Sequence, residues 1–301
     1  MHDLKANFDI IYDKLKFLTQ DIFTAEGNLP RPGPEPKFSD LSVMSLSLTA
    51  EYLSIDSENH LFAKLAVDYA GAFTNLIDRT NYNRRKRKLF QVMERVRKRL
   101  VSDLNEEQDY FIIDSEPLPI CCFSRASRSK TCQEVHWALP SFGYCASQQQ
   151  TYYGYKLHAI VSPEGVIEQY DLSPAHQHDI GFLQDAALQL PPCQLIGDKA
   201  YLSADMQQDL WQNNRIALHT PKRRNQKDYR PFPKVFRRLR KRIETVFSQL
   251  DVQFNTKRNL AITFSGLRSR IVSKVTAFTL VQHLNKFVFH RSTSHVKIAI
   301  Y

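Results

Sequence analysis

Three acidic residues stand at positions where their carboxylates could bind metal ions together. Asp114 follows the apolar residues "FII" and Asp198 follows "LIG", so each is predicted to end a short buried strand. Such a position is unfavourable for an isolated carboxylate, because burial and a like-charged neighbour both oppose its ionised form. In α/β sheets ligands bind at the carboxyl ends of the strands, so a bound cation would account for both residues.

Glu244 is the third acid, within "RKRIETVFSQL", which begins at Arg240. At about 100° per residue, this segment predicts a helix whose apolar face is formed by Ile243, Val246, Phe247 and Leu250. Glu244 lies on the shoulder of that face, where it could pair with Arg240 or Arg237 or act as a catalytic acid. The three acids could together bind two Mg²⁺ ions, with Mn²⁺ as a substitute, because both ions prefer oxygen ligands. Two such ions about 4 Å apart support in-line phosphoryl transfer.

The charge of the chain favours a polyanionic partner. Its 301 residues include 41 Lys and Arg against 31 Asp and Glu, a net charge of +10 with a pI near 9.3. Residues 222–242 alone contain eleven Lys or Arg, which is typical of a surface that follows DNA phosphates, although charge runs are usually only solvated. The candidate DNA-binding residues are Lys222, Arg223, Arg224, Arg237, Arg240 and Lys241 in this run, Arg84, Arg85, Lys86, Arg87 and Lys88 in "RRKRK", and Lys156 and Lys199.

The first third of the chain is predicted to be helical. Apolar residues recur with helical spacing over residues 4–23, two further helices begin after the caps Ser39 and Ser57, and another spans residues 84–104. A helix-turn-helix-like module and a plain helical bundle with a basic face fit this pattern equally well. We therefore expect a helical region over residues 1–105 that binds DNA.

Strand patterns follow this region. "DYFIID", "TYYGYKLHAIV", "VIEQYDL", "CQLIGD" and "NRIALHTP" predict five strands, with a hairpin turn at Pro163-Glu164-Gly165. Helices are predicted over residues 179–190 and 204–212, from Pro233, and over residues 265–287. This order predicts an α/β domain with a mixed sheet over residues 106–290, followed by a C-terminal tail over residues 291–301.

The remaining candidates favour structural roles. The five cysteines lack zinc-ligand spacing, and their odd number predicts free thiols. His176, His178 and Asp179 could form a metal cluster, but we expect them to cap the following helix, Asp179 above all. His158 is expected to be a core histidine, and Phe236 to pack. Neither a signal peptide nor an apolar membrane span is apparent, so we expect a cytoplasmic protein.

Several of these segments together resemble a known family. "IIDSEPLPIC", "TYYGYKLHAIVSPEGVI", "LSPAHQHDI", "LIGDKAY" and "KRIETVFSQL" are similar, in this order, to the DDE transposases of bacterial insertion sequences, and most of all to insertion-sequence family 982. The chain departs from the family in having "DKAY" for "DKGY", glutamines after "CAS", and Arg237 and Asp251 where an outer Tyr and Lys are common.

The resemblance implies a ribonuclease H-like core with Asp114, Asp198 and Glu244 as its catalytic, metal-binding triad. It also implies cleavage at the terminal inverted repeats of a mobile element and joining of the 3′-hydroxyl to target DNA. Pairing of two element ends would require a homodimer on the DNA, within the bacterial nucleoid. A nuclease that does not join ends and a catalytically inactive DNA-binding relic are the alternatives.

Overall fold

The mixed sheet lies in the middle of the chain. The computed structural model describes residues 3–146, 148–222, 225 and 229–297, and in this part of the chain six strands form one sheet. The strand order is β2-β3-β1-β5-β6, with β4 also paired to β3; the β1–β5 and β5–β6 pairs are parallel and the others antiparallel. The strands are β1 (Tyr110–Pro119), β2 (Ser141–Cys145), β3 (Gln150–Val161), β4 (Ile167–Pro174), β5 (Cys193–Ile196) and β6 (Ile216–His219).

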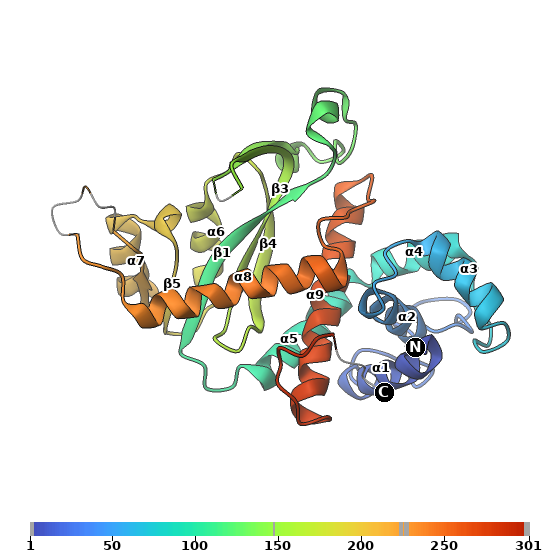
Figure 1. Cartoon of the computed structure of the whole chain (residues 1–301). Coiled ribbons are helices and arrows are strands. Elements are labelled where there is room, and N and C mark those ends of the chain that lie inside the picture. The colour runs from blue at the N-terminus through green and yellow to red at the C-terminus, as the bar shows by residue number, and fades with distance from the viewer. Residues whose placement is uncertain (1–2, 147, 223–224, 226–228, 298–301) are drawn as a thin grey trace. The chain divides into compact units, whose positions relative to one another are not determined.

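Helices cover both faces of this sheet (Figure 1). On one face, Ile113 of β1 and Ile160 of β3 share a buried core with Leu183 and Leu210, which belong to α6 (Asp179–Ala187) and α7 (Ala204–Asn214). On the other face, α8 (Lys234–Phe254) runs in front of β1 and β4. Its predicted apolar stripe is buried, as expected: Ile243, Val246, Phe247 and Leu250. These features, preceded by N-terminal helices, confirm the predicted ribonuclease H-like α/β class.

The β3–β4 hairpin confirms the predicted turn at residues 163–165. The backbone of Ser162 pairs with Val166 on one side of the turn, and Gly165 adopts the positive φ of 79° that the turn requires. The guanidinium of Arg242 on α8 donates a hydrogen bond to the carbonyl oxygen of Glu164. Burial lowers the pKa of Arg242. This arginine of the basic run therefore packs against the hairpin turn and is not simply a solvated charge.

Strand β2 was not predicted from the sequence. Its burial pattern alternates between half-buried and exposed residues, so it lacks the apolar alternation by which strands are recognised. Its Phe142 packs against Tyr153 of β3 with ring centroids 5.0 Å apart, and that packing is available only once β3 has formed.

Substituting Gly154 by Ala should destabilise the sheet at this edge. Gly154 in β3 has φ of 153°, and a Cβ there would overlap the carbonyl oxygen of Leu118 on β1. We expect the free energy of unfolding to fall by about 3 kcal/mol because the backbone must shift. Gly181→Ala is the matched control, since nothing lies within 4 Å of the new methyl in α6. Equal midpoints of the two variants in urea unfolding would contradict the prediction.

The remaining helices belong to a second unit. Residues 104–248 form one compact unit and residues 1–103 with 249–301 form the other. The second contains α1 (Leu4–Leu18), α2 (Asp40–Tyr52), α3 (Glu58–Asp68), α4 (Arg79–Lys88), most of α5 (Phe90–Leu104) and α9 (Phe264–Phe287), together with the last residues of α8. The sequence division grouped residues 249–290 with the sheet instead. The functional division into DNA-binding and catalytic regions stays a prediction.

The predicted helix boundaries are partly correct. Ser39 and Ser57 cap α2 and α3 as expected, each accepting a backbone hydrogen bond. The helix predicted over residues 84–104 is two helices, which meet at Leu89, where the backbone N–H is shared between the carbonyl oxygens of Arg85 and Lys86 as in a tightened last turn. The helix predicted over residues 4–23 ends at Leu18. No helix in the described residues is long and apolar enough to span a membrane.

Candidate active site

Asp114 and Asp198 meet where two parallel strands separate. The parallel pairing of β1 with β5 ends at Ile112 and Ile196, and each aspartate lies two residues beyond that last pair. The two residues therefore occupy equivalent positions beyond that last pair, Asp114 within β1 and Asp198 just after β5. One expectation is wrong: Asp114 does not end its strand, because β1 continues to Pro119 in antiparallel pairing with β3.

Burial and charge strongly perturb Asp114. Its side chain is 22% exposed, and burial, followed by the nearby carboxylates of Asp198 and Asp179, raises its pKa to about 7. Two interactions oppose this rise. The Ser115 backbone N–H donates a hydrogen bond to Asp114 Oδ1 at 2.8 Å, and the positive charge of Arg240 favours the ionised carboxylate. A carboxylate that protonates near neutral pH beside a second acid is typical of a site that receives a cation.

The local backbone holds Asp198 in place. Its Oδ1 accepts the backbone N–H of Ala200 at 2.7 Å, which caps the 3-10 turn η3 (Lys199–Tyr201). The next buried side chain is Tyr201, whose hydroxyl has no hydrogen-bond partner among the described residues. Burial, and then the charges of Asp179, Asp114 and Asp198, raise the pKa of Tyr201, so this hydroxyl stays protonated beside the acids.

Helix α8 brings Arg240 to the site and carries Glu244 one turn further on. Arg240 Nη2 lies 3.7 Å from Asp114 Oδ2, which shows that this face of α8 looks onto β1. Glu244 follows on the same helical face and is exposed. Within the described part of the chain, no three His, Cys, Asp or Glu side chains gather closely enough to hold a metal ion. The structure thus brings two of the three predicted acids together.

A fourth acid, Asp179, lies beside this pair, and its predicted role is wrong. The cap of α6 is His178, which accepts the Ile180 backbone N–H, rather than Asp179. Asp179 Oδ1 instead accepts Lys156 Nζ at 2.9 Å and lies 3.3 Å from Ser115 Oγ. No sequence pattern reveals this arrangement, because it depends on the pairing of β1 with β3.

His158 packs in the core, as predicted. It stacks on Phe182 with ring centroids 4.9 Å apart, and its Nε2 lies 2.7 Å from Ser173 Oγ. Burial lowers the pKa of His158 to about 4, so the ring is neutral at physiological pH. Phe236 also packs as expected, against His219 at 4.8 Å between centroids, and the five cysteines are free thiols.

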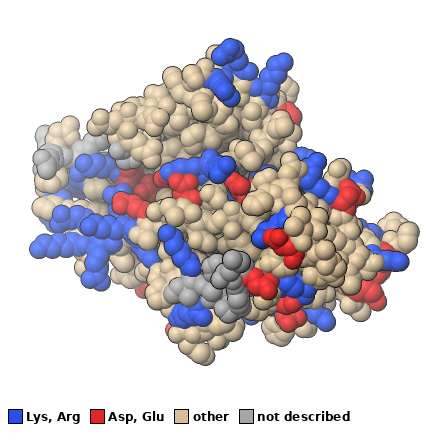
Figure 2. Space-filling model, turned by 45° about the vertical axis from the view of Figure 1, so that its right-hand side comes forward, with Lys and Arg blue, Asp and Glu red and all other residues tan. Residues whose placement is uncertain are grey.

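The candidate DNA-binding residues fall into different environments. Arg85 and Lys86 are engaged inside their unit, with Asp40 at 2.6 Å and Glu58 at 3.2 Å, respectively. Lys156 is bound to Asp179, while Arg223 and Arg224 lie outside the described residues. The other candidates in the described part of the chain, apart from the half-buried Arg240, have exposed side chains: Arg84, Arg87, Lys88, Lys199, Lys222, Arg237 and Lys241. Figure 2 shows a group of Lys and Arg side chains at the left of this face, next to a group of acidic residues, and further Lys and Arg elsewhere on the face.

Comparison with known protein families identifies the family of this chain. A model of the family described as "Transposase DDE domain" matches residues 105–280, more than half of the chain and all six strands. No curated protein matches the sequence. DDE transposases bind DNA and cleave it with the help of divalent metal ions, which is chemistry that Asp114 and Asp198 can support. The chain belongs to the transposase DDE domain family.

Proposed function

We propose that the protein is the transposase of a bacterial insertion sequence related to family 982. It would bind the terminal inverted repeats of its element, cleave the DNA ends and join the freed 3′-hydroxyl to target DNA. The observation that carries this proposal is the placement of Asp114 and Asp198 at the point where β1 and β5 separate. Their shared position and the raised pKa of Asp114 fit a site for positive charge better than a structural one.

The carboxylates of Asp114, Asp198 and Glu244 would hold two Mg²⁺ ions, for which Mn²⁺ can substitute. Bound there, the ions would activate the attacking oxygen and stabilise the leaving one. Arg240, whose Nη2 lies 3.7 Å from Asp114 Oδ2, would turn to a DNA phosphate and leave the carboxylate to the metal ions. Glu244 is exposed on α8 within one helical turn of Arg240, so a rotation of its side chain would complete the triad.

Metal binding should strengthen as pH rises. The pKa of Asp114 is about 7, so below that pH the carboxyl must lose a proton before it can ligate a cation. We expect Mn²⁺ to bind about tenfold more weakly at pH 6 than at pH 8, with little further gain above pH 8. Calorimetry in buffers of different ionisation enthalpy should show a proton released per site at pH 6. Equal affinity at pH 6 and pH 8 would contradict this prediction.

The exposed basic residues of α8 would follow the DNA backbone toward the acids. Arg237 and Lys241 are exposed on the same helix as Glu244, and Lys199 adjoins Asp198. Arg84, Arg87 and Lys88 would provide a further DNA-binding surface on α4. Two protomers would be needed to hold two element ends, so we propose a homodimer on DNA. Light scattering of the complex with paired ends would test this, with one protomer per pair as the contradicting result.

The proposed function can be tested with purified protein and labelled duplexes that carry the ends of the element. We expect nicking at the 3′ ends in Mg²⁺ or Mn²⁺, followed by joined products when target DNA is added. Nicking without joined products would favour a nuclease of the same fold. Specific binding without any nicking would favour an inactive relic. Labelled duplexes with scrambled ends serve as the control for recognition of the terminal repeats.

A further inference from the structure

A basic pocket lies within the unit that contains α3, α4 and α9. Its volume is about 450 Å³, within the range of pockets that hold small organic groups. Four basic side chains and one acidic side chain line it: Arg79, Lys86, Arg87, Arg270 and Glu58. All five belong to one compact unit, far along the chain from Asp114 and Asp198. The pocket is therefore distinct from the candidate active site.

The single acid of the pocket is already satisfied. Glu58 accepts a hydrogen bond from Asn83 Nδ2 at 2.6 Å and pairs with Lys86 Nζ at 3.2 Å. These interactions leave the charges of the three arginines in excess. In the described part of the chain, Arg270 Nη1 donates to the backbone carbonyl of Asp56 at 2.9 Å, which carries no formal charge, and the charge of Arg270 also helps to lower the pKa of Glu58. An anion would complete this arrangement.

The walls of the pocket provide room and a donor for such an anion. Gly266 at the start of α9 has no side chain there, and a Cβ would lie 3.9 Å from Arg87 Nη2. Ser269, one turn further along α9, is 3% exposed, and its Oγ has no partner among the described residues. A buried hydroxyl without a partner in the wall of a basic pocket is a ready donor to a phosphate oxygen.

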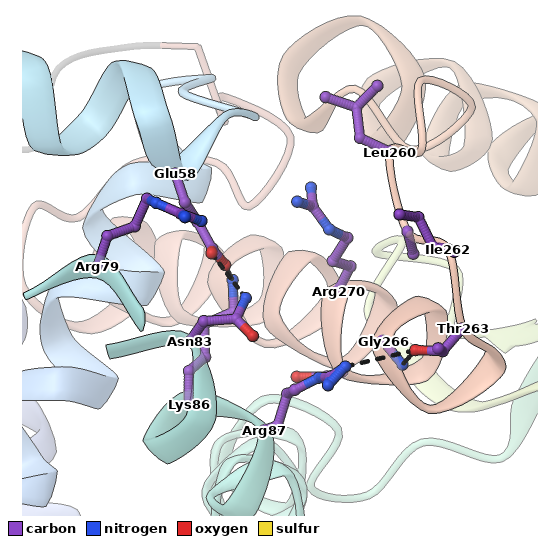
Figure 3. A pocket seen from close by; sticks show the side chains of 12 residues that line it. Glu58, Arg79, Asn83, Lys86, Arg87, Leu260, Ile262, Thr263, Gly266 and Arg270 are labelled. Atoms are coloured by element: carbon purple, nitrogen blue, oxygen red, sulfur yellow. Dashed lines mark hydrogen bonds and ion pairs between the residues drawn. The ribbon is translucent and has the colours of Figure 1, made fainter. Parts of the chain in front are cut away.

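Apolar side chains form the other side of the pocket. Leu260 and Ile262 are 56% and 76% exposed, although exposure of large aliphatic side chains is unfavourable. Figure 3 shows Arg270 reaching into the space between the α4 side chains and Leu260. A ligand with a charged end and a flat apolar part would cover both walls. A nucleotide has both features.

We propose that this pocket binds a phosphate of the DNA backbone together with its nucleoside. The arginines and Ser269 would hold the phosphate, and Leu260 and Ile262 would lie against the sugar and base. The inference that the phosphate belongs to DNA rests on the proposed function. The inference that the pocket binds a phosphate does not, because it rests on the side chains that line the pocket. The proposal assigns Arg79, Ser269 and Arg270, none of which stands out in the sequence, to nucleic-acid binding.

The test uses Arg79→Gln and Arg270→Gln, with Lys16→Gln as a control that removes an exposed charge from α1, outside the pocket. Binding of a labelled duplex is measured in EDTA at several salt concentrations, and binding of dAMP is measured separately. We expect each pocket variant to bind the duplex about fivefold more weakly or worse, with a salt slope lower by about 0.9. Lys16→Gln should change neither, and dAMP should bind only to the unmodified and control proteins.

Each other outcome has a defined meaning. Unchanged duplex binding by both pocket variants would overturn the proposal, and if they also lost dAMP binding the pocket would serve a free nucleotide. If the unmodified protein bound no duplex, the proposed function would fail. Only the dAMP result would then test whether the pocket binds a phosphate. Binding of dAMP that both variants lost would then support a phosphate pocket, and absence of binding would overturn it. Arg79 is exposed, so its variant should fold even if that of Arg270 does not.

Discussion

Substituting Asp114 by Asn is expected to reduce metal-dependent DNA nicking by at least about 10³-fold, because a neutral amide cannot replace a carboxylate that ligates a cation. Asp198→Asn should have a similar effect, since each aspartate lies two residues beyond the last pair of β1 with β5. Both variants should still bind the duplex in EDTA. Initial nicking rates in Mn²⁺ at pH 8 provide the measurement, and a variant within tenfold of the unmodified protein would show that the wrong acid was named.

The same substitution should stabilise the metal-free protein at high pH. The pKa of Asp114 is about 7 in the folded protein, and an unfolded Asp titrates near 3.9. Because the folded pKa is the higher one, folding favours the protonated form, and stability is lost as pH rises from about 4 through about 7. Asn cannot ionise, so the variant should exceed the unmodified protein by about 2 kcal/mol or more at pH 8.

This gain should disappear at low pH or with metal. At pH 4 residue 114 is neutral in both folded proteins, and their free energies of unfolding should agree to within about 0.5 kcal/mol. Adding Mg²⁺ at pH 8 should stabilise the unmodified protein and leave Asp114→Asn unchanged, because only the unmodified protein retains the ligand. Urea unfolding at the two pH values, with and without Mg²⁺, separates these cases. A variant less stable than the unmodified protein at pH 8 would show that Asp114 has a structural role.

Substituting Lys274 by Met should destabilise the helical unit by about 3 to 5 kcal/mol. Lys274 of α9 lies 2.7 Å from Glu51 of α2, and the two side chains are only 1% and 6% exposed. Its Nζ also donates to the carbonyl oxygen of Phe254 at 2.5 Å. Met fills the space of the lysine stem, so the loss comes mainly from leaving Glu51 buried without a cation.

The matched control is Lys64→Met on α3. Lys64 pairs with Asp68 at the same distance of 2.7 Å, but those side chains are 33% and 47% exposed. Water screens such a pair, so we expect little change in the free energy of unfolding. Thermal unfolding of both variants gives the comparison. Similar losses in the two variants would contradict the role of burial, and adding Glu51→Leu to Lys274→Met should restore much of the stability.

Local patterns in the sequence were sufficient for most helices and strands. Ser39 and Ser57 predict helix starts because a serine side chain can accept a hydrogen bond from a backbone N–H in the first turn. The stripe in α8 has a 3.6-residue period, and the turn at Gly165 needs a residue that tolerates positive φ. The same local patterns marked Asp114 and Asp198, because acids after apolar segments are unusual, and Glu244, because it lies beside the apolar face of a basic helix.

The tertiary structure decided which side chains meet. Asp114 and Asp198 are adjacent because parallel pairing aligns Ile112 with Ile196, and no local pattern encodes that register. The same holds for Asp179, whose partner Lys156 comes from β3, and for Arg85, which pairs with Asp40 from another helix. A local pattern indicates only which residues of one segment face water and which face the core. Ion pairs, buried charges and the pocket around Arg270 depend on packing between distant segments, so they arise only in the folded chain.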